Sequence, residues 1–334
     1  MGIENIIAFF GGIALFLLGI SLMEEGLNKV AGDTLRKFLQ KLTNRLFKGM
    51  LLGVAATVII QSSSAISIMS VEFVNAKLMR FRQAVSIILG SILGSSITGW
   101  IVCLSDIDET KGWEVLLSTG TITSIVAIIG IILRNFTGSR KKNRVGEILM
   151  GFAVLMFGMT AITTAVKPFC EHEEFMQVLT AFANPALGIM AGMVFTAMIQ
   201  SSAAAVGVLQ ALAMTGVLEF STAFPIMLGI TVGGAVPVLL SAIGASINGK
   251  RTALVHLLID VIGAAICGIA FYGLESVFHF GIMGIAMTAV TMALLNTMMR
   301  FVMVVVLFPF VGTLEKITGL IVRDASGEKE KKEK

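Results

Sequence analysis

Charged residues are scarce in this sequence: Asp, Glu, Lys and Arg make up 14% of its 334 residues, whereas hydrophobic residue types make up 56%. A soluble domain carries roughly 25% charged residues, so this composition excludes an ordinary soluble protein. Long apolar runs and a mean hydropathy of +0.91 instead predict an all-α polytopic membrane protein. The small net charge of +4 is spread among loops, which gives no basis for nucleic-acid binding.

Cysteine and histidine are also scarce, with three of each in the chain. The cysteines are Cys103, Cys170 and Cys267. They lie far apart and match no zinc or redox spacing, and His256 and His279 lack the spacing of metal ligands. The Gly-x-Ser-x-Gly pattern of many serine hydrolases is missing as well. The sequence therefore predicts neither a metal centre nor a cofactor, and it does not indicate an enzyme.

Apolar runs long enough to cross a membrane are the main feature that the sequence does have. Seven such runs cover residues 5–23, 83–103, 115–133, 147–166, 222–246, 252–273 and 281–311. About 20 apolar residues are needed to cross the hydrocarbon core as a helix. We therefore expect about seven spanning helices, in addition to two further apolar segments that polar residues interrupt.

The charges of the loops predict which side of the membrane each loop faces. Lys and Arg dominate residues 24–48, 77–82 and 134–146, whereas acidic residues dominate 104–114 and 167–185. Because basic residues accumulate in cytoplasmic loops, the N-terminus is predicted to lie outside a cell membrane and the C-terminus in the cytoplasm. Residues 24–48 also have apolar residues near helical spacing, so we expect them to lie along the membrane interface.

Two polar clusters interrupt the two further apolar segments. They are Gln61-Ser62-Ser63-Ser64 and Gln200-Ser201-Ser202. The dozen or so apolar residues on either side of each cluster would rise roughly 18 Å as a helix, which is too short to cross a ~30 Å core. Residues 49–76 begin and end at basic loops, and 188–215 begin and end at acidic ones. Each segment is therefore predicted to be a re-entrant hairpin of two half-helices that meet at a polar turn.

The two hairpins belong to an internal repeat whose matched residues stand 139 positions apart. The pairs are Gly19 and Gly158, Thr57 and Thr196, Gln61 and Gln200, Gly90 and Gly229, and Gly94 and Gly233. The first unit, residues 1–139, is expected to cross the membrane three times, so the second must be inverted. The second unit covers residues 140–315 with the final span, and 316–334 form a charged cytoplasmic tail. Inverted repeats with broken helices are typical of secondary transporters.

The sequence also resembles a known family. Residues 12–27, the doubled Gln-Ser-Ser and the Gly-x-x-x-Gly run after each hairpin resemble the bacterial type II sodium–phosphate cotransporters over about residues 5–315. The resemblance implies that both polar turns line a site for sodium and phosphate, formed by Gln61, Ser62, Ser63, Ser64, Gln200, Ser201 and Ser202. We add to this candidate site Thr57, Thr196, Ser95, Ser96 and Thr231. Sodium is expected near Ser63, Ser64 and Ser202.

Three departures from the family pattern leave the substrate open. The family's run after each hairpin resembles Gly-Ala-Asn-Ile-Gly-Thr-Thr, whereas residues 90–96 read Gly-Ser-Ile-Leu-Gly-Ser-Ser and residues 229–235 read Gly-Ile-Thr-Val-Gly-Gly-Ala. Both asparagines are absent, and the second run has lost its pair of hydroxyls. Ser64 of the first turn is matched by Ala203 in the second.

Asp260 and Arg300 are charged residues inside apolar runs, which makes them functional candidates. The family resemblance places asparagine at both positions, so we expect these two residues to pair in place of two amides. The alternatives are that Arg300 reaches the membrane surface while Asp260 bonds to hydroxyls, or that Asp260 binds a coupling proton or sodium. His256 is expected to bond between helices or to act as a polar gate. With no buried Lys or Arg beside the turns, sodium and helix dipoles would supply the positive field.

These features together predict a sodium-coupled symporter of inorganic phosphate that works by alternating access. The expected partners are inorganic phosphate, Na⁺ as coupling ion and the lipid bilayer; a homodimer is allowed, and nucleic acid is not expected. Three rival interpretations remain: a transporter of another small solute, a channel-like pore, and a membrane subunit that docks a partner through residues 134–146.

Overall fold

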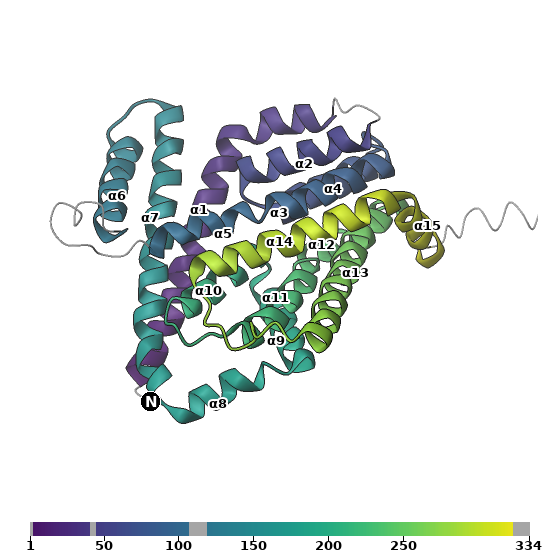
Figure 1. The fold of residues 1–334 in the computed structure, drawn as a ribbon. Helices are drawn as coiled ribbons and strands as arrows, with labels where there is room; N and C mark the ends of the chain where they lie inside the picture. Colours follow the sequence, from purple (N-terminus) through teal and green to yellow (C-terminus); the bar gives the residue numbers. More distant parts are fainter. Residues whose placement is uncertain (1–2, 41–44, 107–118, 323–334) are drawn as a thin grey trace, which may run out of the picture.

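The computed structural model describes residues 3–40, 45–106 and 119–322, and nearly all of them are helical (Figure 1). The first unit contains α1 (Ile3–Gln40), α2 (Leu46–Ile60), α3 (Ser63–Asn75), α4 (Phe81–Gly94), α5 (Ile97–Val102), η1 (Cys103–Asp106) and α6 (Thr119–Asn135). The second begins with α7 (Arg140–Val166), η3 (Lys167–Glu171), α8 (Glu173–Ala181), α9 (Pro185–Ile199), α10 (Ser202–Ala213), α11 (Phe220–Gly233) and α12 (Val236–Ser241). It ends with α13 (Ile247–Phe278), α14 (Ala289–Leu307), η4 (Phe308–Phe310) and α15 (Val311–Ile321).

Six segments of the described chain are long and apolar enough to cross a membrane. They are Ile3–Gly32, Phe81–Val102, Arg140–Cys170, Phe220–Ser241, Ile247–Phe278 and Ala289–Ile321. The seventh predicted run, 115–133, corresponds to α6, whose 17 described residues form a shorter apolar helix. A seventh span is reached only if α8 and α9, which are bent by 95°, are counted as one.

Helix α1 differs from the prediction of a span followed by an interfacial piece. It continues unbroken for 38 residues, so residues 24–40 extend the first span instead of starting a separate helix. Packing explains the continuity, because Leu35 and Leu39 are buried in an apolar cluster with residues of α2, α3 and α4. The apolar spacing within 24–48 therefore marks a face that packs on protein.

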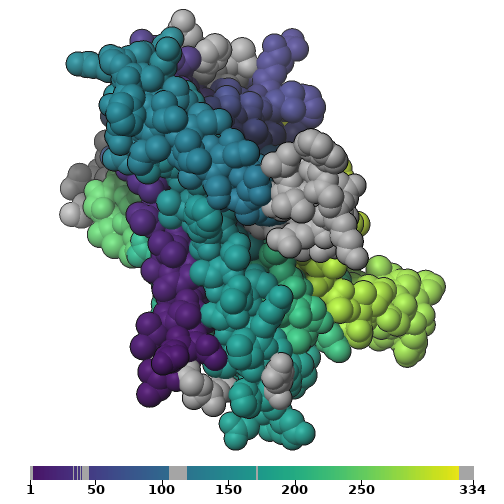
Figure 2. Space-filling model, turned by 90° about the vertical axis from the view of Figure 1, so that its left-hand side faces the viewer, coloured from purple at the N-terminus to yellow at the C-terminus, as the bar shows by residue number. Residues whose placement is uncertain are grey.

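Helices α1 and α7 pack along each other in opposite directions, and Figure 2 shows them side by side. Gly19 lies against the backbone of Leu155, and Gly158, its repeat mate, lies against the backbone of Phe16. Leu155 stands 139 positions after Phe16, so the two contacts are reciprocal. Reciprocal contacts of this kind are the signature of a two-fold related interface. The two repeat units thus meet at this helix pair.

In the first unit, helices α2 and α3 form a hairpin, and α4 packs beside it. Gly53 of α2 lies against the backbone of Ile87, and Gly90 of α4 lies against that of Met50. Gly49 lies against Ser86 and Gly94 against Val54, so later residues of α2 meet later residues of α4 and the two helices are parallel. Helix α3 packs against α4, and only the short turn at 76–80 separates its end from the start of α4. The predicted hairpin 49–76 is therefore present as a helix–turn–helix over 46–75.

The second hairpin repeats this packing with the same register. Gly192 of α9 lies against the backbone of Ile226, and Gly229 of α11 lies against that of Ile189. Each of these residues stands 139 positions after its counterpart in the first hairpin. The predicted hairpin 188–215 corresponds to α9 and α10, and α9 starts at Pro185, where the side chain of Asn184 accepts from the first free N–H groups of the helix.

The predicted final span, 281–311, is divided in the structure. Residues 279–288 are not helical, and the N–H of Met287 donates to the carbonyl of Leu218. Pro309 then separates α14 from α15, as expected for a residue that cannot continue the helical hydrogen bonds. Helix α15 extends to Ile321, so the start of the predicted charged tail is helical; residues 323–334 of that tail lie outside the described residues.

Candidate functional site

The two polar turns have the same backbone conformation. Gln61 and Gln200 both have φ of 61°, in the left-handed region. In each turn the glutamine N–H donates to the carbonyl four residues earlier, that of Thr57 or of Thr196, at 2.7 Å. A non-glycine residue in this region costs of order 1–3 kcal/mol, and such strain collects at ligand sites. Two strained turns at equivalent positions therefore point to a shared function.

A new helix starts directly after each turn. The hydroxyl of Ser62 accepts from the N–H of Ala65 at 3.4 Å, and that of Ser201 accepts from the N–H of Ala204 at 3.2 Å. These caps leave other N–H groups of the first helical turn available. Helix N-termini attract anions because their free N–H groups and the helix dipole point outward. Both predicted serine motifs are thus placed at helix N-termini.

Thr57 and Thr196 are the most unusual polar residues near the turns. Both side chains are fully buried (0% exposed), and neither hydroxyl oxygen has a hydrogen-bond partner in the described part of the chain. An unsatisfied buried hydroxyl costs about 1–3 kcal/mol. Buried threonines in helices normally donate to a carbonyl of the preceding turn, so this double exception requires an explanation such as an ion that these oxygens would hold.

The helix breaks after each hairpin lie next to these threonines. Gly94, at the end of α4, is in contact with the side chain of Thr57, and Gly233, at the end of α11, with that of Thr196. Gly234 follows and lies against Ser202. The structure therefore brings together, within each repeat, the hairpin turn and the Gly-containing run that the sequence singled out. Among the described residues, no hydrogen bond joins one turn directly to the other.

Three of the other predicted hydroxyls have partners within their own helices. Ser95 donates to the carbonyl of Ile92 at 2.8 Å, and Ser96 donates to that of Leu93 at 2.8 Å. Thr231 donates to the carbonyl of Met227 at 3.0 Å. Three serines remain: Ser63 and Ser64 are half-buried and Ser202 is buried, and none of their hydroxyls has a bonding partner within the described ranges.

The two glutamines differ in their surroundings. The amide of Gln61 is buried; it donates to the carbonyl of Val58 at 2.7 Å and accepts from the hydroxyl of Thr98 at 2.9 Å. Gln200 is exposed, and its side chain bonds to none of the described residues. Pro237 stands 139 positions after Thr98 and offers no side-chain donor. The second turn lacks this bond because proline occupies the position that threonine occupies in the first unit.

Each hairpin also contacts the short helix after the break in the other repeat. Gln210 of α10 donates to the carbonyl of Gly99 in α5 at 3.0 Å and to that of Ala289 at 2.9 Å. The equivalent positions are Val71 of α3 and Val238 of α12, which belong to one apolar cluster. The hairpins are therefore interlocked through the opposite unit.

The predicted pairing of Asp260 with Arg300 is wrong as a direct ion pair. Asp260 Oδ2 instead lies 3.2 Å from His256 Nε2, one helical turn earlier on α13. Arg300 donates from Nε to Asn296 at 2.9 Å and to the carbonyl of Ile92 at 3.3 Å. Arg300 is only 4% exposed, so its side chain does not reach the surface. His256 bonds between helices, as expected.

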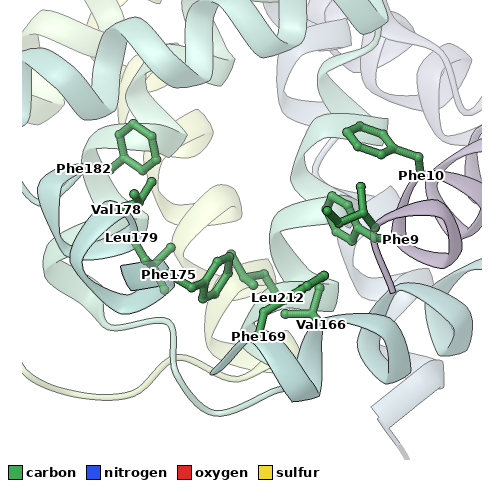
Figure 3. Close-up of a pocket in the computed structure, with 10 residues that line it drawn as sticks. Phe9, Phe10, Val166, Phe169, Phe175, Val178, Leu179, Phe182 and Leu212 are labelled. Carbon is green, nitrogen blue, oxygen red and sulfur yellow. The ribbon is translucent and has the colours of Figure 1, made fainter. Parts of the chain in front are cut away.

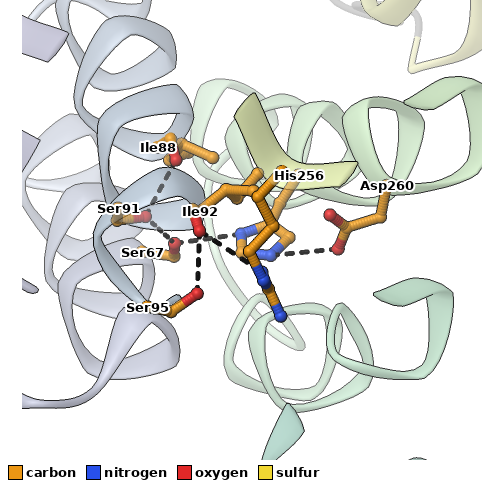
Figure 4. Close-up of polar contacts among 8 residues, drawn as sticks. Ser67, Ile88, Ser91, Ile92, Ser95, His256 and Asp260 are labelled. Carbon is orange, nitrogen blue, oxygen red and sulfur yellow. Dashed lines mark hydrogen bonds and ion pairs between the residues drawn. The ribbon is translucent and has the colours of Figure 1, made fainter. Parts of the chain in front are cut away.

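Arg300 is a buried cation next to the Gly-containing run that follows the first hairpin. The carbonyl of Ile92 accepts from both Arg300 and Ser95, which places the guanidinium beside the break between α4 and α5 (Figure 4). The sequence pattern could not predict this contact, because residues 92 and 300 belong to helices whose pairing is tertiary.

Several other polar contacts were missed from the sequence. Thr98 and Gln210 carry no local signal, since their partners lie on other helices. Ser67 could have been found, because it stands four residues after Ser63 and so lies on the same face of α3. Its hydroxyl bonds to His256.

A separate cavity of about 350 Å³ lies near the N-terminal end of α1 (Figure 3). Apolar side chains line it, among them Phe9, Phe169 and Phe175. With no polar group to replace the water around an anion, such a cavity cannot bind phosphate. The polar turns therefore remain the candidate site.

Two repeated halves, helices of spanning length and broken helices at paired polar turns together define a multi-pass membrane transporter. The Na+/Pi-cotransporter family model matches the chain twice, over residues 15–164 and 155–297, and the chain belongs to this family. The double match confirms the internal repeat: its starting points lie 140 positions apart, close to the predicted 139.

Curated relatives agree with this assignment. The uncharacterized protein YqeW of Bacillus subtilis is 26% identical over 78% of this chain and 81% of its own length. The putative inorganic phosphate export protein YjbB of Escherichia coli is 23% identical over 78% of this chain, which spans about half (46%) of YjbB. The human sodium-dependent phosphate transport protein 2B is 28% identical over 36% of this chain and 18% of its length. No solved structure shows significant similarity to the chain.

Proposed function

We propose that this protein is a sodium-coupled symporter of inorganic phosphate. The observation that carries the proposal is the pair of buried, unpartnered hydroxyls of Thr57 and Thr196, each next to a strained polar turn. Hydroxyl and carbonyl oxygens are the ligands that a small hard cation prefers. Family membership supports sodium as that cation and phosphate as the anion.

The proposed site divides the two cargoes between two kinds of group. Sodium binds to threonine and serine oxygens near Thr57, Ser63 and Ser64 in the first unit and near Thr196 and Ser202 in the second. Phosphate binds to the N–H and O–H donors at the starts of α3 and α10. Bound sodium neutralises part of the phosphate charge, because cation and anion share a region of low dielectric.

The proposed topology is an inverted repeat of units 1–139 and 140–315 with two re-entrant hairpins. The antiparallel, reciprocal contacts of α1 and α7 support it, since they relate the units by a two-fold axis perpendicular to those helices. Movement of the interlocked hairpin units relative to the rest would open the site alternately to either side. The N-terminus outside and the C-terminus inside remain predictions from loop charge.

Export of phosphate is a second candidate for the direction of flux in the cell. The relative YjbB is described as a putative inorganic phosphate export protein, which favours this alternative. The same site serves either direction, because a symporter is reversible and the ion gradients determine the net flux.

Uptake into liposomes tests the proposal. Purified protein is reconstituted, and radiolabelled phosphate uptake is followed under an inward sodium gradient and, separately, under potassium and proton gradients. We expect saturable uptake that requires sodium and is lost in Gln61→Ala and Gln200→Ala. Gln177→Ala, which changes an exposed glutamine on α8 outside both hairpins, serves as the matched control.

The other outcomes separate the rival functions. Phosphate flux that does not saturate and ignores the sodium gradient would indicate a pore. If the protein takes up another oxyanion or small solute but no phosphate, that solute is the substrate. Folded protein that transports none of these would favour a membrane subunit of a larger assembly.

A further inference from the structure

A row of buried polar groups connects helix α13 to the first hairpin (Figure 4). Asp260 Oδ2 lies 3.2 Å from His256 Nε2, and His256 Nδ1 lies 2.9 Å from the hydroxyl of Ser67 on α3. The hydroxyl of Ser67 lies 3.3 Å from that of Ser91 on α4, which in turn donates to the carbonyl of Ile88 at 2.8 Å. All four linked side chains are at most 3% exposed.

The number of hydrogens available to these polar groups determines how many protons must be bound if every contact between them is to be a hydrogen bond. Ser91 gives its only hydroxyl hydrogen to Ile88, so the contact between Ser67 and Ser91 requires the hydrogen of Ser67. His256 Nδ1 must then donate to Ser67, and a hydrogen is also required between Nε2 and Asp260. All of these contacts are hydrogen bonds only if His256 and Asp260 together hold one more proton than a neutral imidazole and an ionised carboxylate hold.

With a neutral imidazole and an ionised carboxylate, one contact lacks a hydrogen. If the imidazole hydrogen is on Nε2, Ser67 must donate to Nδ1, and its contact with Ser91 is left with two oxygens and no hydrogen. If the hydrogen is on Nδ1, the unprotonated Nε2 faces the carboxylate. In a buried network each such defect is costly, so the geometry favours the extra proton.

Arg300 is the charged group that faces this pair from a neighbouring helix. The other titratable side chains on the helices packed against α13 are exposed: Glu72, Arg82, Glu315 and Lys316. Helices α11 and α12 contain no titratable residue. With Asp260 ionised and His256 neutral, the cluster with Arg300 has no net charge, and the extra proton raises the charge to +1.

The cluster adjoins the proposed anion site. Ser67, which His256 contacts, stands one helical turn after Ser63 at the start of α3, where the proposed anion-binding N–H groups lie. A positive charge gained here favours anion binding, and by linkage a bound anion favours the proton. Val206 and Ile230 stand 139 positions after Ser67 and Ser91, so the second hairpin has no such row.

We propose that His256 and Asp260 form a proton-binding site that takes up one proton when the anion binds and that links the first hairpin to α13. The proposal rests on the proposed binding of phosphate and adds the proton as a second coupled ion. The proton comes from solvent and returns to it, and no covalent bond to the anion is formed or broken.

Calorimetry of phosphate binding in buffers of different ionisation enthalpy counts the protons taken up. Phosphate itself titrates near neutral pH, but its contribution cancels in the difference between wild type and His256→Gln, measured with sodium present. We expect that difference to be roughly one proton per phosphate when the wild-type site is fully coupled. His279→Gln, which changes an exposed histidine, should keep the wild-type count.

Two results of the calorimetry have different meanings. If both wild type and His256→Gln bind phosphate with heat and take up the same number of protons per phosphate, the proton site is overturned and the proposed phosphate binding stands. No phosphate heat in the folded wild-type protein would contradict the proposed function instead.

Nuclear magnetic resonance of the histidine rings tests the site without any transport and without a His256 variant. The chain has only three histidines, so His172→Gln together with His279→Gln leaves His256 as the single labelled ring. We expect its ¹⁵N signals to show a larger protonated fraction of the ring when phosphate is added at constant pH. A ring that stays neutral with and without phosphate, or a protonated fraction that phosphate does not change, would overturn the proposal.

Discussion

The two hairpins have the same backbone but different side-chain chemistry. Gln61 and Gln200 share one φ angle and one capping pattern, yet Gln61 is buried and bonded to Thr98 whereas Gln200 is exposed. The first hairpin is also tied through Ser67 to His256, a link that the second lacks. The two halves therefore share the turn geometry and the buried threonines, while the first half has additional polar contacts. We interpret the shared features as the binding site for sodium and phosphate and the unshared contacts as groups that regulate this site.

The largest expected effect tests whether both halves pack alike. Gly53→Leu and Gly192→Leu each place a side chain against the backbone of the neighbouring helix, at Ile87 and Ile226. We expect each variant to lose about 3 kcal/mol of stability, the upper range for overpacking, measured as thermal unfolding in detergent. Gly273→Leu, where the structure leaves open space, should unfold like wild type. A loss of stability in only one of the two variants would show that the two hairpins do not pack alike.

Removing the unpartnered hydroxyls should affect ion binding but not folding. Thr57→Val and Thr196→Val keep the side-chain shape and remove an oxygen that no described residue satisfies. We expect unchanged or slightly higher thermal stability, and about a tenfold rise in the sodium concentration for half-maximal uptake, since a bond to a charged group contributes about 1.5–3 kcal/mol. Uptake against sodium concentration measures the effect. Unchanged sodium dependence in both variants would remove these hydroxyls from the site.

The two glutamines should separate stability from transport. Gln61→Ala breaks the bond to Thr98 and leaves that buried hydroxyl unpaired, so we expect a loss of about 1–2 kcal/mol. Gln200→Ala breaks no bond among the described residues and should unfold like wild type, although uptake falls in both. Thermal unfolding without substrate provides the comparison. Equal losses of stability would show that the second glutamine has a structural role.

The smallest expected effect comes from making the second turn more like the first. Ala203→Ser restores the hydroxyl that Ser64 supplies in the first turn, at a half-buried position. We expect about a twofold decrease in the sodium concentration for half-maximal uptake, as suits one weak additional ligand, with unchanged unfolding temperature. A large loss of stability would show instead that position 203 packs against a neighbouring helix.

Much of the fold was predictable because it depends on local chemistry. A glutamine and serines within an uncharged run predicted each helix break, and the structure places the first helix of each hairpin within three residues of its expected start. The repeat offset paired the glycines of the two units, and the structure shows that the members of each pair pack alike. The continuity of α1 was not predictable, because loop charge and amphipathic spacing look alike for an interfacial helix and for one packed on protein.

The candidate site was predictable only in part. Sequence reasoning selected Thr57 and Thr196 through the repeat, but their lack of partners appears only in three dimensions. The partner of Asp260 was visible in principle, since His256 stands one helical turn before it. Family reasoning favoured Arg300 instead, because two asparagines had been replaced together. The pair that forms is local to α13, whereas the contact of Arg300 with the carbonyl of Ile92 is tertiary and absent from any local pattern.

Sodium and phosphate are proposed to bind together at the two turns. Equilibrium binding of radiolabelled phosphate to the purified protein, with sodium compared with potassium at equal ionic strength, examines this without transport. We expect saturable binding that requires sodium and is lost in the Thr57→Val, Thr196→Val double variant while that variant stays folded. Equal phosphate binding in potassium, or wild-type binding by the double variant, would rule out a joint site at the turns.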